Sequence, residues 1–217
     1  MSNLPKVKDK QETMTFKTVN FAIWDQLLVS GTNFLFSIVL ARAFTPEEFG
    51  LYLFSFTTLV LAIAFLNAVL CGSISVLLAP YEGDELREYI WNSFVLFCII
   101  SLGLSFSLFL ASLFLDKTSF SSNASALRDI SFILFAFLGQ DYFRRILLSK
   151  LMVFDVFIVD ILTYVPRIVI LLAFYSQLTT GRIIYLFGLT SVFGIFFALY
   201  KIRSHFHGEK IIKREIW

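Results

Sequence analysis

The sequence predicts an all-α fold, a polytopic integral membrane helical bundle of about six transmembrane helices. Hydrophobic residues make up 58% of the 217 residues, charged residues make up 16%, and the mean hydropathy is +0.79. A soluble domain of this length would not need so much apolar sequence to form a core. The apolar residues also gather into blocks near or above the roughly 20 residues that a bilayer crossing requires, at residues 21–43, 51–79, 90–115, 127–148, 152–175 and 182–201.

The first block carries polar residues at helical steps. They recur at intervals of four, three and four residues, so on a helix they fall within a narrow arc. We call them the polar stripe: Gln26, Ser30, Asn33 and Ser37. Lipid cannot satisfy amides and hydroxyls, so we expect the polar stripe to face a protein partner or a water-filled cavity.

The first two blocks are separated by a very short connection. Thr45 has the character of an N-cap, Pro46 fits the first helical position, and Glu47 and Glu48 suit the positive end of the helix dipole. We therefore expect two helices that pack side by side. Arg42, at the end of the first helix, could contact a phosphate near the outer surface, or its side chain could reach the interface without binding anything.

The remaining sequence divides into a membrane core and two tails. Residues 1–20 are polar and are expected to be disordered or to lie at the interface, residues 21–201 form the bundle, and residues 202–217 form a basic tail or a truncated linker. The second block exceeds one crossing, and Cys71-Gly72-Ser73 offers a break near its end. No cleavable signal peptide is visible, so the first helix is expected to act as an uncleaved anchor.

The fifth block contains charges inside an apolar helix. Asp160 and Arg167 are seven residues apart, with Tyr164 between them on the same face. Charges at this depth usually face a bundle interior or an aqueous cavity. Two interpretations stay open: Arg167 attracts an anionic group such as a lipid diphosphate, or Asp160 and Arg167 form a structural pair.

The basic residues set the expected orientation. With both termini on the cytoplasmic side, most of the 18 lysines and arginines lie inside. Outer positions receive only Arg42, Lys117, Arg128 and Arg182. Arg144 and Arg145 then lie at the inner end of the fourth helix, where positive charge suits the lipid headgroups. Asp25 and Asp155 lie near inner membrane faces, where we expect them to be solvated or paired with lysines.

Two parts of the chain resemble a known family. The stretch from Gln26 to Tyr52, with its "LAR" and "PEEFGLY" segments, resembles the amino-terminal signature of polysaccharide and lipid-linked oligosaccharide (O-antigen type) flippases. These belong to the multidrug/oligosaccharidyl-lipid/polysaccharide exporter superfamily. The resemblance extends more weakly to Gln140–Arg145 and Asp160.

The resemblance implies translocation of a lipid-linked saccharide, such as a prenyl-diphosphate-linked glycan, across the cytoplasmic membrane. Family members typically have two six-helix bundles around a cationic cavity, and here the resemblance covers one. It therefore implies a second six-helix bundle as partner, from the same or another chain, besides membrane lipid.

Other classes of function receive less support from the sequence. A non-transporting subunit or scaffold of a polysaccharide-assembly complex stays open, and so does an integral-membrane glycan enzyme, which lacks a large outer loop with catalytic carboxylates. The net charge of +2 is too small to indicate nucleic acid. His205 and His207 alone are weak evidence for a metal. We expect no enzymatic activity, no cofactor and no metal.

Overall fold

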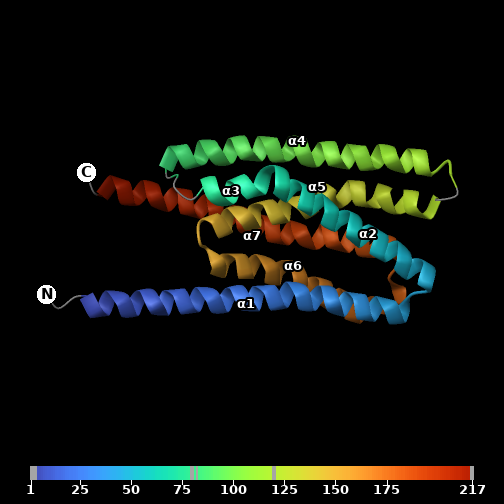
Figure 1. Cartoon of the computed structure of the whole chain (residues 1–217), viewed down its shortest axis with the longest axis horizontal. Coiled ribbons are helices and arrows are strands. Elements are labelled where there is room, and N and C mark those ends of the chain that lie inside the picture. Colours follow the sequence, from blue (N-terminus) through green and yellow to red (C-terminus); the bar gives the residue numbers. More distant parts are fainter. Residues whose placement is uncertain (1–3, 79–80, 82, 119–120, 216–217) are drawn as a thin grey trace.

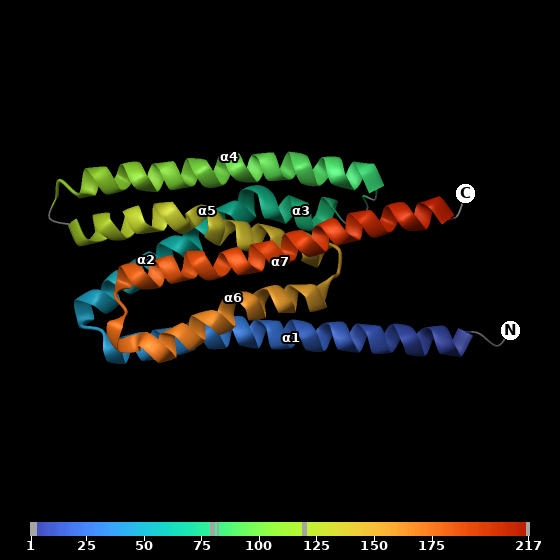
Figure 2. The ribbon, with the colours of Figure 1, turned by 180° about the vertical axis from the view of Figure 1, so that it is seen from behind.

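The computed structural model confirms the all-helical fold class. It describes the backbone of residues 4–78, 81, 83–118 and 121–215, and no strand occurs among them. The long helices run alongside one another, and α1 and α4 lie at opposite edges (Figures 1 and 2). The helices are α1 (Leu4–Ala43), α2 (Pro46–Leu66), α3 (Gly72–Leu77), α4 (Gly83–Leu115), α5 (Ser121–Ser149), α6 (Val153–Phe174) and α7 (Thr180–Glu215).

Five segments of the described helices are long and apolar enough to cross a membrane. They lie in α1, α2 with its continuation, α4, α6 and α7: Asn20–Ala43, Pro46–Ile74, Asp84–Leu115, Val153–Phe174 and Thr180–Arg203. The expected fourth block is absent from this group, because α5 carries several charged residues. α5 nevertheless runs alongside the others (Figure 1).

α5 is the central helix of the bundle. It packs against α2, α3, α4, α6 and α7, and 15 of its 29 residues are buried. Protein therefore covers most of the middle of this helix, where lipid would otherwise lie. A helix in that position can carry polar side chains, provided that its neighbours satisfy them.

The turn between α1 and α2 forms as expected, but the packing beyond it does not. The Thr45 hydroxyl accepts from the Glu48 amide at 3.3 Å, the Glu48 carboxylate accepts from the Thr45 amide at 3.1 Å, and Pro46 opens the helix. The two helices diverge from the turn (Figure 1): α1 packs mainly on α6, and α2 on α5. The prediction of side-by-side packing was wrong, because a short turn fixes where two helices meet but not their crossing angle.

The second block breaks where the sequence predicts. A π-helical turn, η1 (Asn67–Cys71), ends α2, and α3 begins at Gly72. A Cβ atom at Gly72 would lie 3.2 Å from the Asn67 carbonyl oxygen, so glycine suits this turn. At the amino terminus, α1 begins at Leu4, so the segment expected to be a polar tail extends the first helix.

Candidate functional site: the polar interior of the bundle

A charged network joins three helices in the bundle interior. The Nε of Arg144 (α5) donates to a carboxylate oxygen of Asp160 (α6) at 2.7 Å, and its Nη2 donates to the carboxylate of Asp25 (α1). One turn earlier on α5, Gln140 donates to the other oxygen of Asp160 at 3.2 Å. Asp160 is completely buried, and Asp25 is 6% exposed.

This network corrects the roles expected for two residues. Asp25 was expected to be solvated or paired with a lysine, and Arg144 was expected to lie at the inner helix end, where positive charge suits the lipid headgroups. Instead they bind each other across 119 positions of sequence. Helices α1, α5 and α6 are thereby held together by charge-assisted hydrogen bonds, which are stronger than neutral ones.

Arg167 lies in a separate, largely aromatic cage. Its guanidinium centre lies 4.8 Å from the ring centroids of Tyr164 and Phe187 and 5.8 Å from that of Phe137. Its donors bind one segment of α7: the Thr190 hydroxyl at 2.7 Å, the Ser191 hydroxyl at 3.0 Å and the Phe187 carbonyl at 3.1 Å. Arg167 is 3% exposed, so it fastens α6 to α7 from inside.

The structural pair between Asp160 and Arg167 is therefore wrong as an interpretation. Asp160 bonds to Arg144 and Gln140, and among the described residues Arg167 is in no ion pair. The physical reason is distance: seven residues correspond to about 10 Å along a helix axis, whereas direct contacts form between residues three or four apart. A role of Asp160, Tyr164 and Arg167 in binding substrate stays a prediction.

The polar stripe lies on the outside of this bundle. Gln26 and Ser30 are exposed, and Asn33 and Ser37 are half-buried. Two bonds of the stripe stay within α1: Gln26 donates to the Ser30 hydroxyl at 3.0 Å, and Ser37 to the Asn33 carbonyl at 3.0 Å. Ser37 also forms a side-chain hydrogen bond with Tyr52 of α2. The buried face of α1 is a neighbouring one, formed by Asp25, Thr32, Phe36 and Leu40. The bundle itself therefore leaves Gln26 and Ser30 uncovered and covers Asn33 and Ser37 in part.

The other charged residues expected near the helix ends lie outside the Arg144 network. Asp155 pairs with Lys201 at 2.9 Å, as expected for a carboxylate near a lysine. Arg145 pairs with Asp141 at 2.9 Å one turn earlier on α5. Arg42 is exposed at the end of α1 and is in no ion pair within the described part of the chain.

Sequence reasoning missed the partners of Arg144 and Arg167. Gln140 and Arg144 are four residues apart, so their shared helix face was readable from the sequence, and both lie in the Gln140–Arg145 segment that carries part of the resemblance. Thr190 and Ser191 stand as a polar pair inside an apolar block, which is a weaker signal for a buried hydrogen-bond site.

Comparison with known proteins identifies one family. The family model described as polysaccharide biosynthesis protein matches residues 17–216, nearly the whole chain. No curated protein and no solved structure matches the chain.

Proposed function

Because this chain belongs to the polysaccharide biosynthesis protein family, we propose that it helps to move a lipid-linked saccharide across the cytoplasmic membrane. The cargo class, a prenyl-diphosphate-linked glycan, follows from the resemblance of Gln26–Tyr52 to flippases. The role is transport without bond-breaking chemistry. Both termini face the cytoplasm in this proposal, since the basic residues favour that orientation.

The observation that carries the proposal is the uncovered part of the polar stripe. Gln26 and Ser30 are exposed within the membrane-spanning segment Asn20–Ala43. A polar group left in hydrocarbon without partners costs several kcal/mol, and the single bond between these two side chains leaves other donors and acceptors unused. A second helical bundle, from the same or another chain, therefore covers the stripe and leaves a polar seam between two walls.

Two bundles around one polar seam suit alternating access, in which one bundle rocks against the other. In this proposal the Arg144 network holds α1, α5 and α6 together, and the Arg167 cage fixes where α6 meets α7. Arg42 is an exposed cation on the helix that carries the stripe, at the end next to the α1–α2 turn. It is therefore available to the phosphate groups of the cargo.

The proposal is tested by photo-crosslinking from α1 in living cells. A photoreactive phenylalanine analogue replaces Ser30 on the stripe or, as the matched control, Leu35, which is 44% exposed and lies about 140° around the same helix. We expect a protein adduct from position 30 and only lipid adducts from position 35. Absence of a protein adduct from position 30 would contradict a covered stripe.

A non-transporting subunit is the second candidate, favoured by one observation. Arg144 and Arg167 both donate to groups within this bundle, as in a structural element. Both candidates predict the crosslink, so a flipping assay must separate them. The captured complex is reconstituted into vesicles with a fluorescent prenyl-diphosphate saccharide. Transport that falls in Gln26→Leu and Arg42→Gln supports the transporter, and absence of transport supports the subunit.

A further inference from the structure

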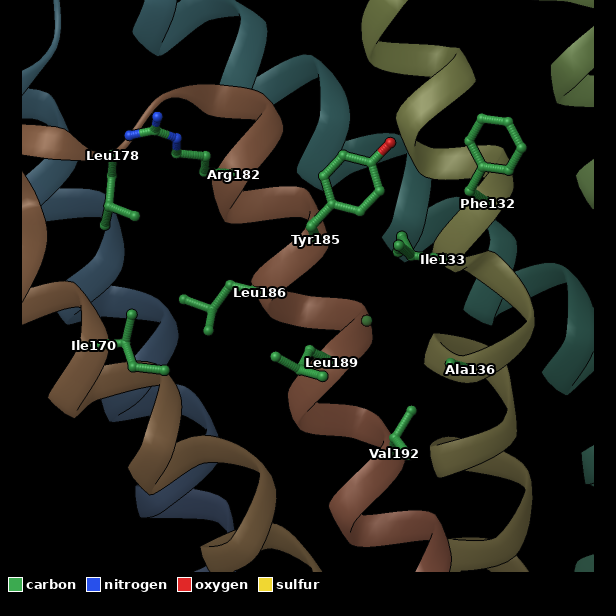
Figure 3. A pocket seen from close by; sticks show the side chains of 11 residues that line it. Phe132, Ile133, Ala136, Ile170, Leu178, Arg182, Tyr185, Leu186, Leu189 and Val192 are labelled. Carbon is green, nitrogen blue, oxygen red and sulfur yellow. The ribbon is translucent and has the colours of Figure 1, made fainter.

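An open groove runs along the outer face of α7, between α5 and α6. Its volume is about 650 Å³, within the range of ligand sites in proteins. Figure 3 shows its apolar lining from three helices. The lining includes Phe132 and Ala136 of α5, Ile170 of α6, and Leu186, Leu189 and Val192 of α7.

Two small residues, Gly188 of α7 and Ala136 of α5, line the groove. A Cβ atom at Gly188 would lie 2.6 Å from the Cβ of Ile133, so any larger residue would push α7 away from α5. Ala136, on the α5 side, leaves open space that a larger side chain would fill (Figure 3). The shape of the groove therefore depends on the small side chains at these two positions.

The length of the groove matches one leaflet of a bilayer. From Arg182 to Val192 the lining runs ten residues along α7, which is about 15 Å at 1.5 Å per residue. That is half of the ~30 Å hydrocarbon core. Arg182 also stands two residues after the start of the membrane-spanning segment Thr180–Arg203, where headgroups meet the hydrocarbon.

Charges of both signs flank this end of the groove. Arg182 is exposed, and its guanidinium donates to the Gln177 carbonyl. Asp129 lies against the first turn of α7: it accepts from the Tyr185 hydroxyl at 2.9 Å, and a Cβ at Gly181 would be 2.9 Å from its other oxygen. Within the described part of the chain, neither Arg182 nor Asp129 is in an ion pair.

We propose that this groove binds one chain of a zwitterionic phospholipid, with the lipid phosphate at Arg182 and its ammonium group at Asp129. An apolar channel one leaflet long fits a single hydrocarbon chain. The charge pattern fits a headgroup that carries both signs, because an anionic headgroup without an ammonium would leave Asp129 beside a negative charge. This site is distinct from the polar stripe and independent of transport.

The test uses the full chain in vesicles of equal phosphatidylethanolamine and phosphatidylglycerol. Each lipid in turn carries a photoactivatable group in its chain, and peptide mass spectrometry locates the label. We expect labelling to concentrate between residues 178 and 192, with phosphatidylethanolamine labelling more than phosphatidylglycerol. Arg182→Gln should lower labelling about fivefold, the factor equivalent to the ~1 kcal/mol of one basic residue at a membrane surface.

Matched variants separate the groove from the general surface. Ala136→Phe fills the groove, so label should no longer gather between residues 178 and 192. Ala41→Phe, at an exposed site on α1, should leave the labelling pattern unchanged. Lys117→Gln removes an exposed cation that does not line the groove and should change nothing. Asp129→Asn should remove the preference for phosphatidylethanolamine.

Three results would overturn the proposal. Label spread evenly over the exposed faces of α1, α4 and α6 would leave no specific site. Labelling that is unchanged by Arg182→Gln would exclude the headgroup contact. Arg182 is exposed, so we expect this variant to fold. Equal labelling by the two lipids in the parent protein would exclude the zwitterionic assignment.

Discussion

Removing Arg144 should destabilise this bundle more than any other single loss of charge in it. Arg144 is the shared partner of two buried carboxylates, Asp25 and Asp160. At an effective dielectric constant of 20, two charges about 4 Å apart attract by about 4 kcal/mol, and much of that only offsets their desolvation. Arg144→Gln deletes both attractions and leaves two uncompensated buried carboxylates. Breaking one buried pair in this way typically costs 3–5 kcal/mol, so we expect at least that loss.

The measurement is the free energy of unfolding in mixed detergent micelles during titration with dodecyl sulfate. The matched control is Arg145→Gln at the next position. The ion pair of Arg145 with Asp141 is more exposed, at 28% and 14% for the two side chains, so its loss should lower the unfolding free energy by about 1 kcal/mol or less. The triple change Asp25→Asn, Arg144→Gln and Asp160→Asn removes all three charges and should recover most of the stability. A triple variant as unstable as Arg144→Gln would refute the electrostatic reasoning, and so would equal losses at positions 144 and 145.

Three further predictions concern other positions. The unfolding free energy of Arg167→Met should stay within about 1 kcal/mol of the parent value, because this variant no longer carries the cost of burying a charge. The Thr190 and Ser191 hydroxyls keep their backbone acceptors, which are the carbonyls of Leu186 and Phe187. Loss of transport in that folded variant would give Arg167 a role with the cargo, and unchanged transport would remove it. Leu151 has a φ of 57° and is 81% exposed, so Leu151→Gly should stabilise the α5–α6 turn by about 1 kcal/mol; a loss of stability would contradict this. Without Cys71 and Cys98, a cysteine at Ser121 should react with an impermeant thiol reagent in intact cells and one at Ser204 should not, and the reverse pattern would invert the orientation.

Local signals in the sequence predicted local structure correctly. The Thr45–Glu48 cap needs only residues three apart, and the break at Gly72 needs only one turn of helix. The apolar blocks gave the helices, because burial in lipid demands a long apolar segment wherever the helix lies. α5 shows the limit of that rule, since the sequence of a helix covered mostly by protein is set by packing and hydrogen bonding rather than by contact with lipid.

The interior contacts could not be predicted in the same way. Many carboxylates at a similar depth are possible partners for Arg144, and the sequence does not state which helices surround α5. The pairing with Asp25 depends on α1 leaving the α1–α2 turn toward α6, which is decided by the summed packing of both helices. The polar stripe was found by periodicity, but periodicity fixes only its position on α1 and not what covers it.

In the proposed transporter, the two arginine sites and the polar stripe have different roles. Arg144 joins α1, α5 and α6, and Arg167 joins α6 to α7, so the charged interior links four helices into one body. A wall that rocks against a partner must keep its own packing while the seam between the walls opens and closes. The polar stripe suits that seam, because Gln26, Ser30, Asn33 and Ser37 can exchange protein partners for water at low cost, whereas an apolar face would resist wetting. Strong contacts inside the bundle and weaker, wettable ones on its surface are thus what a moving wall requires.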